Sequence, residues 1–315
     1  MPEPIIEIKD LTKDYEGKRA VDHLNLNINK GEIFGLLGPN GAGKTTVILM
    51  LLGLSEPTGG SIKISGYDST TEPLKVKKIT GYLPDQVGFY ENRTGLENLL
   101  YTARLNGISG KRAYESAEKL LDIVGLREAK YKKTGIYSKG MKQRLGLADV
   151  LIKEPEIIIL DEPTIGIDPK GINEFLDLIR KLSKDKGITV LLSSHLLHQV
   201  QKICDRVGLF VDGRLLAEGN IDEMAEKLFN NKEIAIKAQV SNITQDLIDD
   251  LKKIEGIRKV SYSGDWLIIK SIENVTPAIA KSIIAKGGSL YQLSYEKYGL
   301  DEIYQYYFEG GVRHD

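Results

Sequence analysis

The segment that decides the fold is residues 33–46, Ile33-Phe34-Gly35-Leu36-Leu37-Gly38-Pro39-Asn40-Gly41-Ala42-Gly43-Lys44-Thr45-Thr46. Its apolar beginning, Ile33 to Leu37, predicts a buried strand, and the apolar run that follows, Val47 to Leu54, predicts a helix. The loop between them has the pattern G-x-x-x-x-G-K-T. A loop of this pattern between a strand and a helix is typical of a phosphate-binding site.

Each residue type in this loop suits an anion. Glycines at 38, 41 and 43 let the backbone come close to a phosphate and turn its N–H groups inward. The helix that begins near Gly43 adds the positive end of its dipole. Lys44 is long enough to reach the β- and γ-phosphates of a nucleotide, and Thr45 offers a hydroxyl to Mg²⁺. The predicted phosphate-binding residues are Gly38, Pro39, Asn40, Gly41, Ala42, Gly43, Lys44, Thr45 and Thr46.

The composition is that of a soluble globular chain with room for two domains. The chain has 315 residues, of which 41% are hydrophobic and 28% charged, and its net charge is −1. A charge so near zero does not favour a large nucleic-acid footprint. The single cysteine, Cys204, excludes an internal disulfide framework, and we expect it to be a packed residue.

We expect neither a secretory signal nor a membrane span. The start of the chain, Met1-Pro2-Glu3-Pro4, lacks a basic stretch followed by an apolar one. The longest apolar run, Val47 to Leu54, is far shorter than the ~20 residues that a span requires. Any role at a membrane therefore has to come through a partner chain.

Strands and helices alternate through the first 229 residues, which predicts an α/β fold with much parallel sheet. The predicted strands are 4–9 at a sheet edge, 24–29, 61–65, 79–83, 157–160, 188–192, 207–211 and 215–217. Predicted helices are 94–107, which opens on a Thr94/Glu97 capping box, 109–125, 138–152 and 171–182. Asp212-Gly213 indicates a hairpin turn, and Tyr15 is expected in a polar turn.

A polar linker, Asn230-Asn231-Lys232, divides the chain into predicted domains at 1–229 and 230–315. The second domain has strands at 233–240, 259–262, 266–270 and 289–294, helices at 244–254 and 277–286, and a final helix at 300–308. The resulting β-α-β-β-α-β order is ferredoxin-like, a small α+β fold. Six of the chain's 15 tyrosines fall between 291 and 307. We expect most of them in the core of this domain, and a dimer contact is the alternative.

Two acids end the apolar strand Ile157 to Leu160. Asp161 at the end of a buried strand suits Mg²⁺, held together with Thr45. Glu162 beside it suits a general base that polarises a water. On their own, two acids after a strand more often form a solvated turn or a helix cap. Downstream of a phosphate loop in the same sheet, the catalytic interpretation becomes the better one.

A further helix opens at Tyr137-Ser138-Lys139-Gly140-Met141. Ser138 is a good N-cap residue, and capping alone would explain it. The alternative is a second phosphate site at this helix N-terminus, formed by Ser138 and Gly140.

With these motifs in order, the chain resembles the ATP-binding subunit of an ABC transporter over about residues 4–228. Residues 38–45 are similar to the Walker A motif of that family, 160–162 to its Walker B motif and catalytic glutamate, and 137–141 to its signature. Gln86 falls where the Q-loop glutamine belongs, 164–168 resembles the D-loop, His195 the switch histidine, and Tyr15 the aromatic residue that stacks on adenine.

The resemblance implies a P-loop NTPase domain of the ABC type with a helical subdomain, and ATP and Mg²⁺ as its ligands. It implies Glu162, His195 and Gln86 as catalytic residues, and Thr45, Gln86 and Asp161 as metal ligands. It also implies that each ATP lies between the phosphate loop of one subunit and the signature of another. We therefore expect a head-to-tail homodimer, or a pair with a related ATP-binding chain, and no nucleic-acid partner.

Membrane-spanning partners complete the implied assembly. A permease subunit would dock on residues 86–102 and hold the chain, a cytoplasmic protein, on the inner face of the cell membrane. The usual signature is Leu-Ser-Gly-Gly-Gln, whereas this chain has Lys139 and Met141 at the third and fifth positions. This variant, and more weakly the tail at 229–315, is similar to the exporter branch of ABC-2 type systems.

Several features also have simpler interpretations. A histidine after a strand is more often packed or capping than catalytic, and this is what we expect of His198; His195 is singled out only by the resemblance. The seven positive charges within 127–144 indicate a solvated face, or alternatively steering of nucleotide or of an anionic membrane surface.

A soluble ABC-type ATPase that acts on ribosomes or DNA is the alternative function, and a nucleotide-gated regulator is a third. The single ATP domain argues against the ribosomal class, and the absence of a heptad array or CxxC argues against the DNA-repair class. The intact Glu162 argues against a mere regulator.

Overall fold

A computed structural model describes residues 3–229, 234–296 and 299–307 of the chain. It divides into two compact units, Met1–Ile221 and Asp222–Asp315. The predicted linker, Asn230-Asn231-Lys232, lies outside the described residues. The helix α8, Ile221–Phe229, falls almost wholly in the second unit, whereas the sequence assigned these residues to the first domain.

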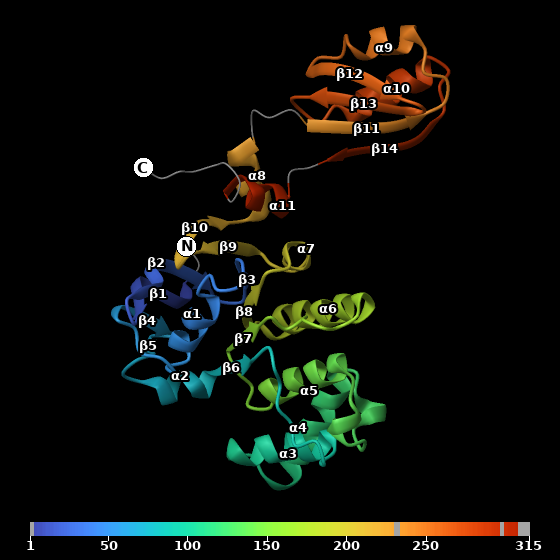
Figure 1. The fold of residues 1–315 in the computed structure, drawn as a ribbon. Helices are drawn as coiled ribbons and strands as arrows, with labels where there is room; N and C mark the ends of the chain where they lie inside the picture. Colours follow the sequence, from blue (N-terminus) through green and yellow to red (C-terminus); the bar gives the residue numbers. More distant parts are fainter. Residues whose placement is uncertain (1–2, 230–233, 297–298, 308–315) are drawn as a thin grey trace. The chain divides into compact units, whose positions relative to one another are not determined.

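The first unit is built around a six-stranded sheet in the order β10-β9-β3-β8-β7-β6 (Figure 1). Its strands are β3 Ile33–Leu37, β6 Thr80–Leu83, β7 Ile157–Asp161, β8 Thr189–Ser194, β9 Arg206–Val211 and β10 Arg214–Gly219. All neighbours are parallel except the β9–β10 hairpin, which turns at Asp212-Gly213 as predicted. The strands β3, β7 and β8 are buried along their whole length, and this explains their continuous apolar runs.

Strand order brings the functional segments together. In a parallel sheet the carboxyl ends of neighbouring strands meet at one edge. Here β8 lies between β3 and β7, so the residues after Leu37, Asp161 and Ser194 share that edge. The phosphate loop, the acid pair and His195 follow these three strand ends.

A second, four-stranded sheet has the order β2-β1-β4-β5, with β1 Pro4–Tyr15, β2 Lys18–Asn29, β4 Gly59–Ile64 and β5 Tyr67–Asp68. Helix α1, Lys44–Leu51, shares one core with both sheets through Val47 and Ile48. The prediction of 4–9 as an edge strand is wrong, because β1 pairs with β2 on one side and with β4 on the other. Tyr15 ends β1 instead of lying in a free turn.

Helices α3 Gly95–Leu105, α4 Gly110–Ile123 and α5 Lys139–Leu151 form a helical subdomain, drawn in green in Figure 1. The predicted capping box is confirmed, since Thr94 accepts from the Glu97 N–H and Glu97 accepts from the Thr94 N–H. Ser138 caps α5 by accepting from the Met141 N–H at 3.2 Å. The remaining helices are α2 Pro73–Ile79, α6 Pro169–Lys186 and α7 Leu197–Val200. Two short 3-10 helices are Arg127–Ala129 and Thr134–Ile136.

Cys204 follows α7 and contacts β3. A methyl group added to Gly35 would lie 3.0 Å from the Cys204 Sγ, so the thiol packs directly on the backbone of that strand. Burial raises the pKa of the thiol well above its usual range. The prediction of a packed cysteine is confirmed.

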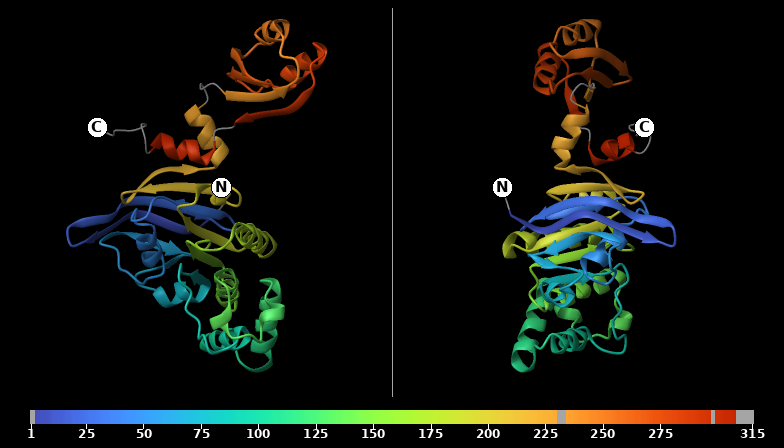
Figure 2. Two further views of the ribbon diagram at one scale, coloured as in Figure 1. Left: turned by 45° about the vertical axis from the view of Figure 1, so that its right-hand side comes forward. Right: turned by 90° about the vertical axis from the view of Figure 1, so that its left-hand side faces the viewer.

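The second unit has the predicted order β11 Ile234–Val240, α9 Gln245–Leu251, β12 Ile257–Ser263, β13 Trp266–Ser271, α10 Thr276–Ala285 and β14 Leu290–Glu296. Its antiparallel sheet has the order β12-β13-β11-β14, which is the ferredoxin-like arrangement. Both helices contribute to one core on one face of this sheet, through Leu247 of α9 and Ile279 of α10 (Figures 1 and 2). The final helix is α11, Leu300–Gln305.

No helix among the described residues is long and apolar enough to cross a membrane.

Candidate functional site

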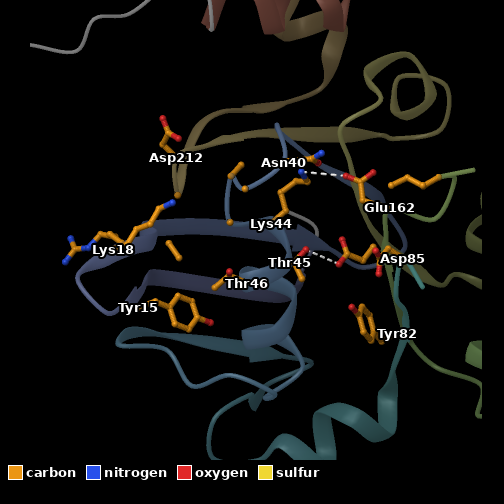
Figure 3. Close-up of a pocket in the computed structure, with 18 residues that line it drawn as sticks. Tyr15, Lys18, Asn40, Lys44, Thr45, Thr46, Tyr82, Asp85, Glu162 and Asp212 are labelled. Carbon is orange, nitrogen blue, oxygen red and sulfur yellow. Dashed lines mark hydrogen bonds and ion pairs between the residues drawn. The ribbon is translucent and has the colours of Figure 1, made fainter. Parts of the chain in front are cut away.

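A cavity of about 890 Å³ opens at the shared edge of the six-stranded sheet (Figure 3). The phosphate loop contributes its residues 40–46, and Asp161 and Glu162 line the same cavity. The cavity lining consists of Tyr15, Lys18, Arg19, Ala20, Asn40, Gly41, Ala42, Gly43, Lys44, Thr45, Thr46, Tyr82, Asp85, Asp161, Glu162, Ile165, Asp212 and Gly213. Of the predicted loop residues, Gly38 and Pro39 are absent from this lining, but both contact Lys44.

The glycines of the loop are required by its packing. A methyl group on Gly43 would lie 2.3 Å from the Ala20 carbonyl oxygen, and one on Gly38 would lie 1.9 Å from that of Phe210. Gly43 also has φ 104°, in the left-handed region, immediately before α1 begins. Gly41, with φ +83°, has open space around it. The loop therefore has a fixed shape that depends on Gly38 and Gly43 for close approach to the rest of the unit.

Lys44 is a buried cation inside the loop. Only 6% of it is exposed, and its Nζ donates to the carbonyls of Gly38 at 2.7 Å and Pro39 at 3.0 Å. Its Nζ is also 3.7 Å from Oε1 of Glu162. Burial lowers the pKa of Lys44, while the charges of Glu162 and Asp161 act in the opposite direction. These acids thus help to keep a desolvated ammonium group charged next to the loop.

Thr45 and Asp161 meet as predicted. The Thr45 hydroxyl donates to Oδ2 of Asp161 at 3.1 Å, and Asp161 is 4% exposed. The other carboxylate oxygen of Asp161 accepts a short hydrogen bond from the hydroxyl of Ser193, at the end of β8. Ser193 was not predicted from the sequence, because a serine near a strand end carries no distinctive local pattern.

Glu162 contacts Ser193, His195 and Lys44. Its backbone has φ 48°, a left-handed conformation, and its N–H donates to the Ser193 carbonyl at 3.1 Å. Oε2 lies 2.9 Å from Nδ1 of His195. Oε1 is buried and has no hydrogen-bond partner among the described residues; its nearest cation is Lys44. A buried carboxylate oxygen that accepts no hydrogen bond within the described residues is suited to accept one, or a proton, from a molecule in the cavity.

Tyr15 lines the opposite side of the cavity and is 45% exposed (Figure 3). Its ring lies under the Lys13 ammonium, 4.8 Å from the ring centroid, and its hydroxyl is 3.4 Å from that of Ser55. An exposed aromatic face at the mouth of a phosphate cavity is available for stacking on a nucleotide base. The adjacent cations Lys18 and Arg19 also line the cavity and were not predicted.

Gln86 is not brought to Thr45 and Asp161 in this structure. Its neighbour Asp85 lines the main cavity, but Gln86 lines a different one of about 300 Å³, together with Tyr137, Lys139 and Gln143. Its predicted contact with the metal therefore requires another position of this loop, and the role stays a prediction.

Ser138 and Gly140 lie elsewhere again. They line a cavity of about 270 Å³ with Asp168, Gly171 and Glu174, which is separate from the phosphate-loop cavity within the chain. The capping role of Ser138 is confirmed, whereas the phosphate-binding role of Ser138 and Gly140 is not tested. The side chain of His198 lies outside the described part of the chain.

Tyr82 is a further residue that the sequence did not single out. It lines the cavity from β6, and burial, together with the nearby charges of Asp161 and Asp85, raises its pKa to about 12. Asp212 and Gly213 line the cavity too, although their sequence signal was only that of a hairpin turn.

Comparisons with known proteins place the chain among similar sequences of one family. A family profile described as "ABC transporter" matches residues 21–165. The chain is 45% identical to the bacitracin transport ATP-binding protein BcrA of Bacillus licheniformis over 223 residues, 71% of this chain and 72% of that protein. It is 35% identical over 295 residues to the uncharacterized ABC transporter ATP-binding protein YhcH of Bacillus subtilis, which covers 92% of this chain and 91% of that protein. It is 41% identical to the daunorubicin/doxorubicin resistance ATP-binding protein DrrA of Streptomyces peucetius, over 73% of this chain and 69% of that protein.

Solved structures give the same result for the first unit. The ATP-binding cassette MJ0796, in a dimeric post-hydrolysis state bound to ADP and Pi, matches with a TM-score of 0.63 and 27% identity, covering 68% of this chain and 98% of that chain. A structure described as the ATP binding subunit of an ABC transporter matches with a TM-score of 0.64 and 32% identity, over 71% of this chain and 93% of that chain.

The fold, the loop–acid–histidine cluster and these relatives lead to one conclusion: the chain belongs to the ATP-hydrolysing ATP-binding subunits of ABC transporters.

Proposed function

We propose that two copies of this chain enclose two MgATP molecules head to tail and that hydrolysis powers export through a separate membrane-spanning partner. The proposal rests on one observation: the predicted nucleotide-binding residues line two separate cavities of the chain. Lys44 and Glu162 line one cavity, and Ser138 and Gly140 line another. A nucleotide that uses both sets has to bridge two chains.

Thr45 and Asp161 would hold the metal ion. A hydroxyl and a carboxylate are the oxygen donors that Mg²⁺ prefers, and Mg²⁺ commonly binds through one or two carboxylates plus substrate phosphates. The described residues contain no cluster of three or more His, Cys, Asp or Glu that could hold a metal alone. When bound, Mg²⁺ neutralises charge on the phosphates. Gln86 would reach the same ligand set after its loop moves.

Three residues would carry the chemistry. Lys44 balances the charge of the phosphates. Glu162 polarises the attacking water through Oε1, the oxygen for which the described residues provide no hydrogen-bond donor. His195 positions Glu162 by its contact with the other oxygen, Oε2, 2.9 Å away. A base fixed in this way loses little conformational freedom when water is to be activated.

Adenine would stack on Tyr15, whose ring lies exposed at the cavity. Lys18 adds positive charge on the same side, whereas the charge of Arg19 is compensated by its ion pairs with Asp14 and Asp22.

The membrane-spanning partner would dock on the helical subdomain. A groove of about 330 Å³ is lined there by Arg93, Glu97, Leu100, Tyr101 and Arg104. Arg93 stacks on the rings of Tyr90 and Tyr101, 4.8 and 5.2 Å from their centroids, so its charge is held at the surface. Two arginines against one glutamate favour a partner segment that carries an acidic side chain.

A hydrogen-bonded connection joins this groove to the signature. Thr134 is fully buried; its N–H donates to the Arg93 carbonyl at 2.9 Å and its hydroxyl to the Tyr90 carbonyl at 3.1 Å. Ser138 follows four residues later in the sequence. A partner that displaces Tyr90 and Arg93 would therefore also displace Thr134, and with it the nearby signature residue Ser138.

The transported compound is proposed from the relatives. BcrA is named for bacitracin transport and DrrA for daunorubicin and doxorubicin resistance. Both names support export of a bulky antibiotic-like compound by this chain and its partner, with the chain peripheral on the inner face of the cell membrane. The alternative action on ribosomes or DNA has no such support.

The decisive experiment is sedimentation of Glu162→Gln with and without MgATP. We expect a monomer without nucleotide and a dimer with it, because the site is then occupied but not turned over. The matched control adds Ser138→Arg, which should abolish the dimer while each chain still binds nucleotide. A dimer that survives Ser138→Arg, or no dimer in Glu162→Gln, would contradict the head-to-tail arrangement.

A further inference from the structure

Gln143 is a buried side chain to which neither the nucleotide site nor the docking groove gives a role. It lies in the first half of α5, the helix that Ser138 caps, and is 1% exposed. Its Nε2 donates to the carbonyl oxygen of Asp85 at 3.3 Å. Asp85 is the residue immediately before Gln86. One side chain thus joins the helix that bears the signature to the loop that bears the predicted metal ligand.

Asp85 lies at the boundary between the two cavities. It lines the main cavity beside Thr45 and Asp161, and it also lines the smaller cavity beside Gln86 and Gln143. The contact with Gln143 therefore holds the loop at the point where Gln86 would enter or leave the phosphate region.

The other half of the Gln143 amide is unsatisfied. Its Oε1 is buried and has no hydrogen-bond partner among the described residues. Buried side-chain acceptors without a partner are rare, so each one requires an explanation. The backbone N–H groups of the adjacent loop are donors that could satisfy Oε1 when that loop takes a second position.

The loop also follows α5 on both sides of Gln86. A methyl group on Gly146 of α5 would lie 2.5 Å from the Leu83 side chain and 3.2 Å from that of Val87. This close approach leaves little room for the loop to slide along the helix. A polar anchor and a close apolar contact together tie the loop to the helix in this position.

We propose that Gln143 is a positioning residue for hydrolysis: through the Asp85 carbonyl it sets where Gln86 stands relative to the signature helix. The inference rests on the proposed role of Gln86 in binding the metal. Gln143 touches neither nucleotide nor metal; it determines whether the loop delivers Gln86 to them.

The test is a double-mutant cycle on the Mg²⁺ dependence of ATP hydrolysis by the full chain. Gln143→Met keeps the length of the side chain and removes its N–H donor. We expect the Mg²⁺ concentration for half-activation to rise, or kcat to fall, by about 10–100-fold, as for partners that orient metal ligands. In a Gln86→Ala background, the same substitution should have no further effect.

The outcomes separate the possible roles. An equal loss in both backgrounds would mean that Gln143 only stabilises the fold, and no loss in either would mean that the contact is idle; both overturn the inference. If Gln86→Ala alone keeps wild-type Mg²⁺ dependence, the proposed role of Gln86 fails, and the inference fails with it for that distinct reason.

Two further variants serve as a replacement and as a control. If Gln143→Met does not fold, Gln143→Leu replaces it; its side chain also has no donor for the Asp85 carbonyl, and the same non-additivity with Gln86→Ala is expected. Lys142→Met is the neighbouring control, since it removes only a partly exposed ion pair with Glu91, 3.1 Å long. A Lys142→Met effect as large as that of Gln143→Met would overturn the inference.

Discussion

The phosphate-loop side and the signature side of the proposed nucleotide site differ in how complete they are within one chain. Lys44, Asp161 and Glu162 are each 9% exposed or less and contact one another or a shared neighbour, Ser193. Gln86 is exposed, and Ser138 and Gly140 line a cavity of their own. One side is assembled within a single chain, whereas the other, in the proposed arrangement, requires movement of the Gln86 loop or a second chain. Preorganised groups supply catalysis without reorganisation, and movable groups supply control.

Glu162→Gln is the most severe change to the preorganised side. Removal of the general base should reduce ATP hydrolysis by about 10²–10⁴-fold while ATP still binds, because Lys44, Thr45 and Asp161 are unchanged. Steady-state turnover and nucleotide titration measure the two effects separately. If the variant hydrolyses ATP at close to the wild-type rate, Glu162 is not the general base.

Ser193→Ala tests whether the preorganisation itself matters. The change removes the hydroxyl that donates to Oδ1 of Asp161, and we expect a loss of about 10–100-fold in Mg²⁺ affinity or activity. Ser194→Ala is the matched control, since Ser194 is equally buried in β8 but its hydroxyl accepts from the Leu196 N–H. Equal effects of the two substitutions would point to damage to the strand and not to the aspartate.

Tyr15→Ala changes binding and leaves the chemistry intact. Stacking on a base contributes about 1–3 kcal/mol in nucleic-acid systems, and we expect a loss of that order in ATP affinity with an unchanged kcat. Tyr15→Phe keeps the ring and loses only the hydroxyl near Ser55, so it should bind ATP like the wild type. If Tyr15→Ala binds ATP as tightly as the wild type, Tyr15 does not stack on the base and only ends β1.

Removal of the second unit should have the smallest effect on the nucleotide site. No residue of β11–β14 lines any of the cavities described above. A chain that ends at Asn220 should bind ATP with unchanged affinity and lose part of its self-association or its coupling to the partner, as sedimentation and titration would measure. This end is better than one near Asn230, because Phe229 of α8 packs edge-on against Tyr306 within the second unit, with ring centroids 6.0 Å apart. Lost ATP binding in a folded, shortened chain would contradict the separation of the two units.

The sequence was most informative where function and local pattern coincide. The phosphate loop is one continuous segment, so its residues, its flanking strand and its helix could be predicted together. Asp161 could be paired with Thr45 because strand ends in a parallel sheet meet at one edge. Ser193 could not be found, because its role comes only from the order of β7 and β8.

Other failures have the same origin in non-local contacts. The alternation of Ile6 and Ile8 with charges shows one wet face of β1, but it carries no information about the later strand β4 that covers its edge. Residues 222–229 gave no boundary signal, since a helix at a junction can belong to either unit and only its packing decides. Gln86 was found by order along the chain, which identifies a residue but does not fix the position of its loop.

Because Cys204 is the single cysteine of the sequence, a second cysteine placed near the signature could be labelled selectively. Cys204 packs on Gly35, and burial raises the pKa of its thiol, so it holds little of the thiolate that reacts with labelling reagents. A cysteine introduced at an exposed position beside the signature, such as Ile136, which is 74% exposed, is therefore expected to react faster than Cys204 in an otherwise native chain. A fluorescent label at that position could report, in the proposed dimer, the approach of the signature of one chain to the phosphate loop of the other.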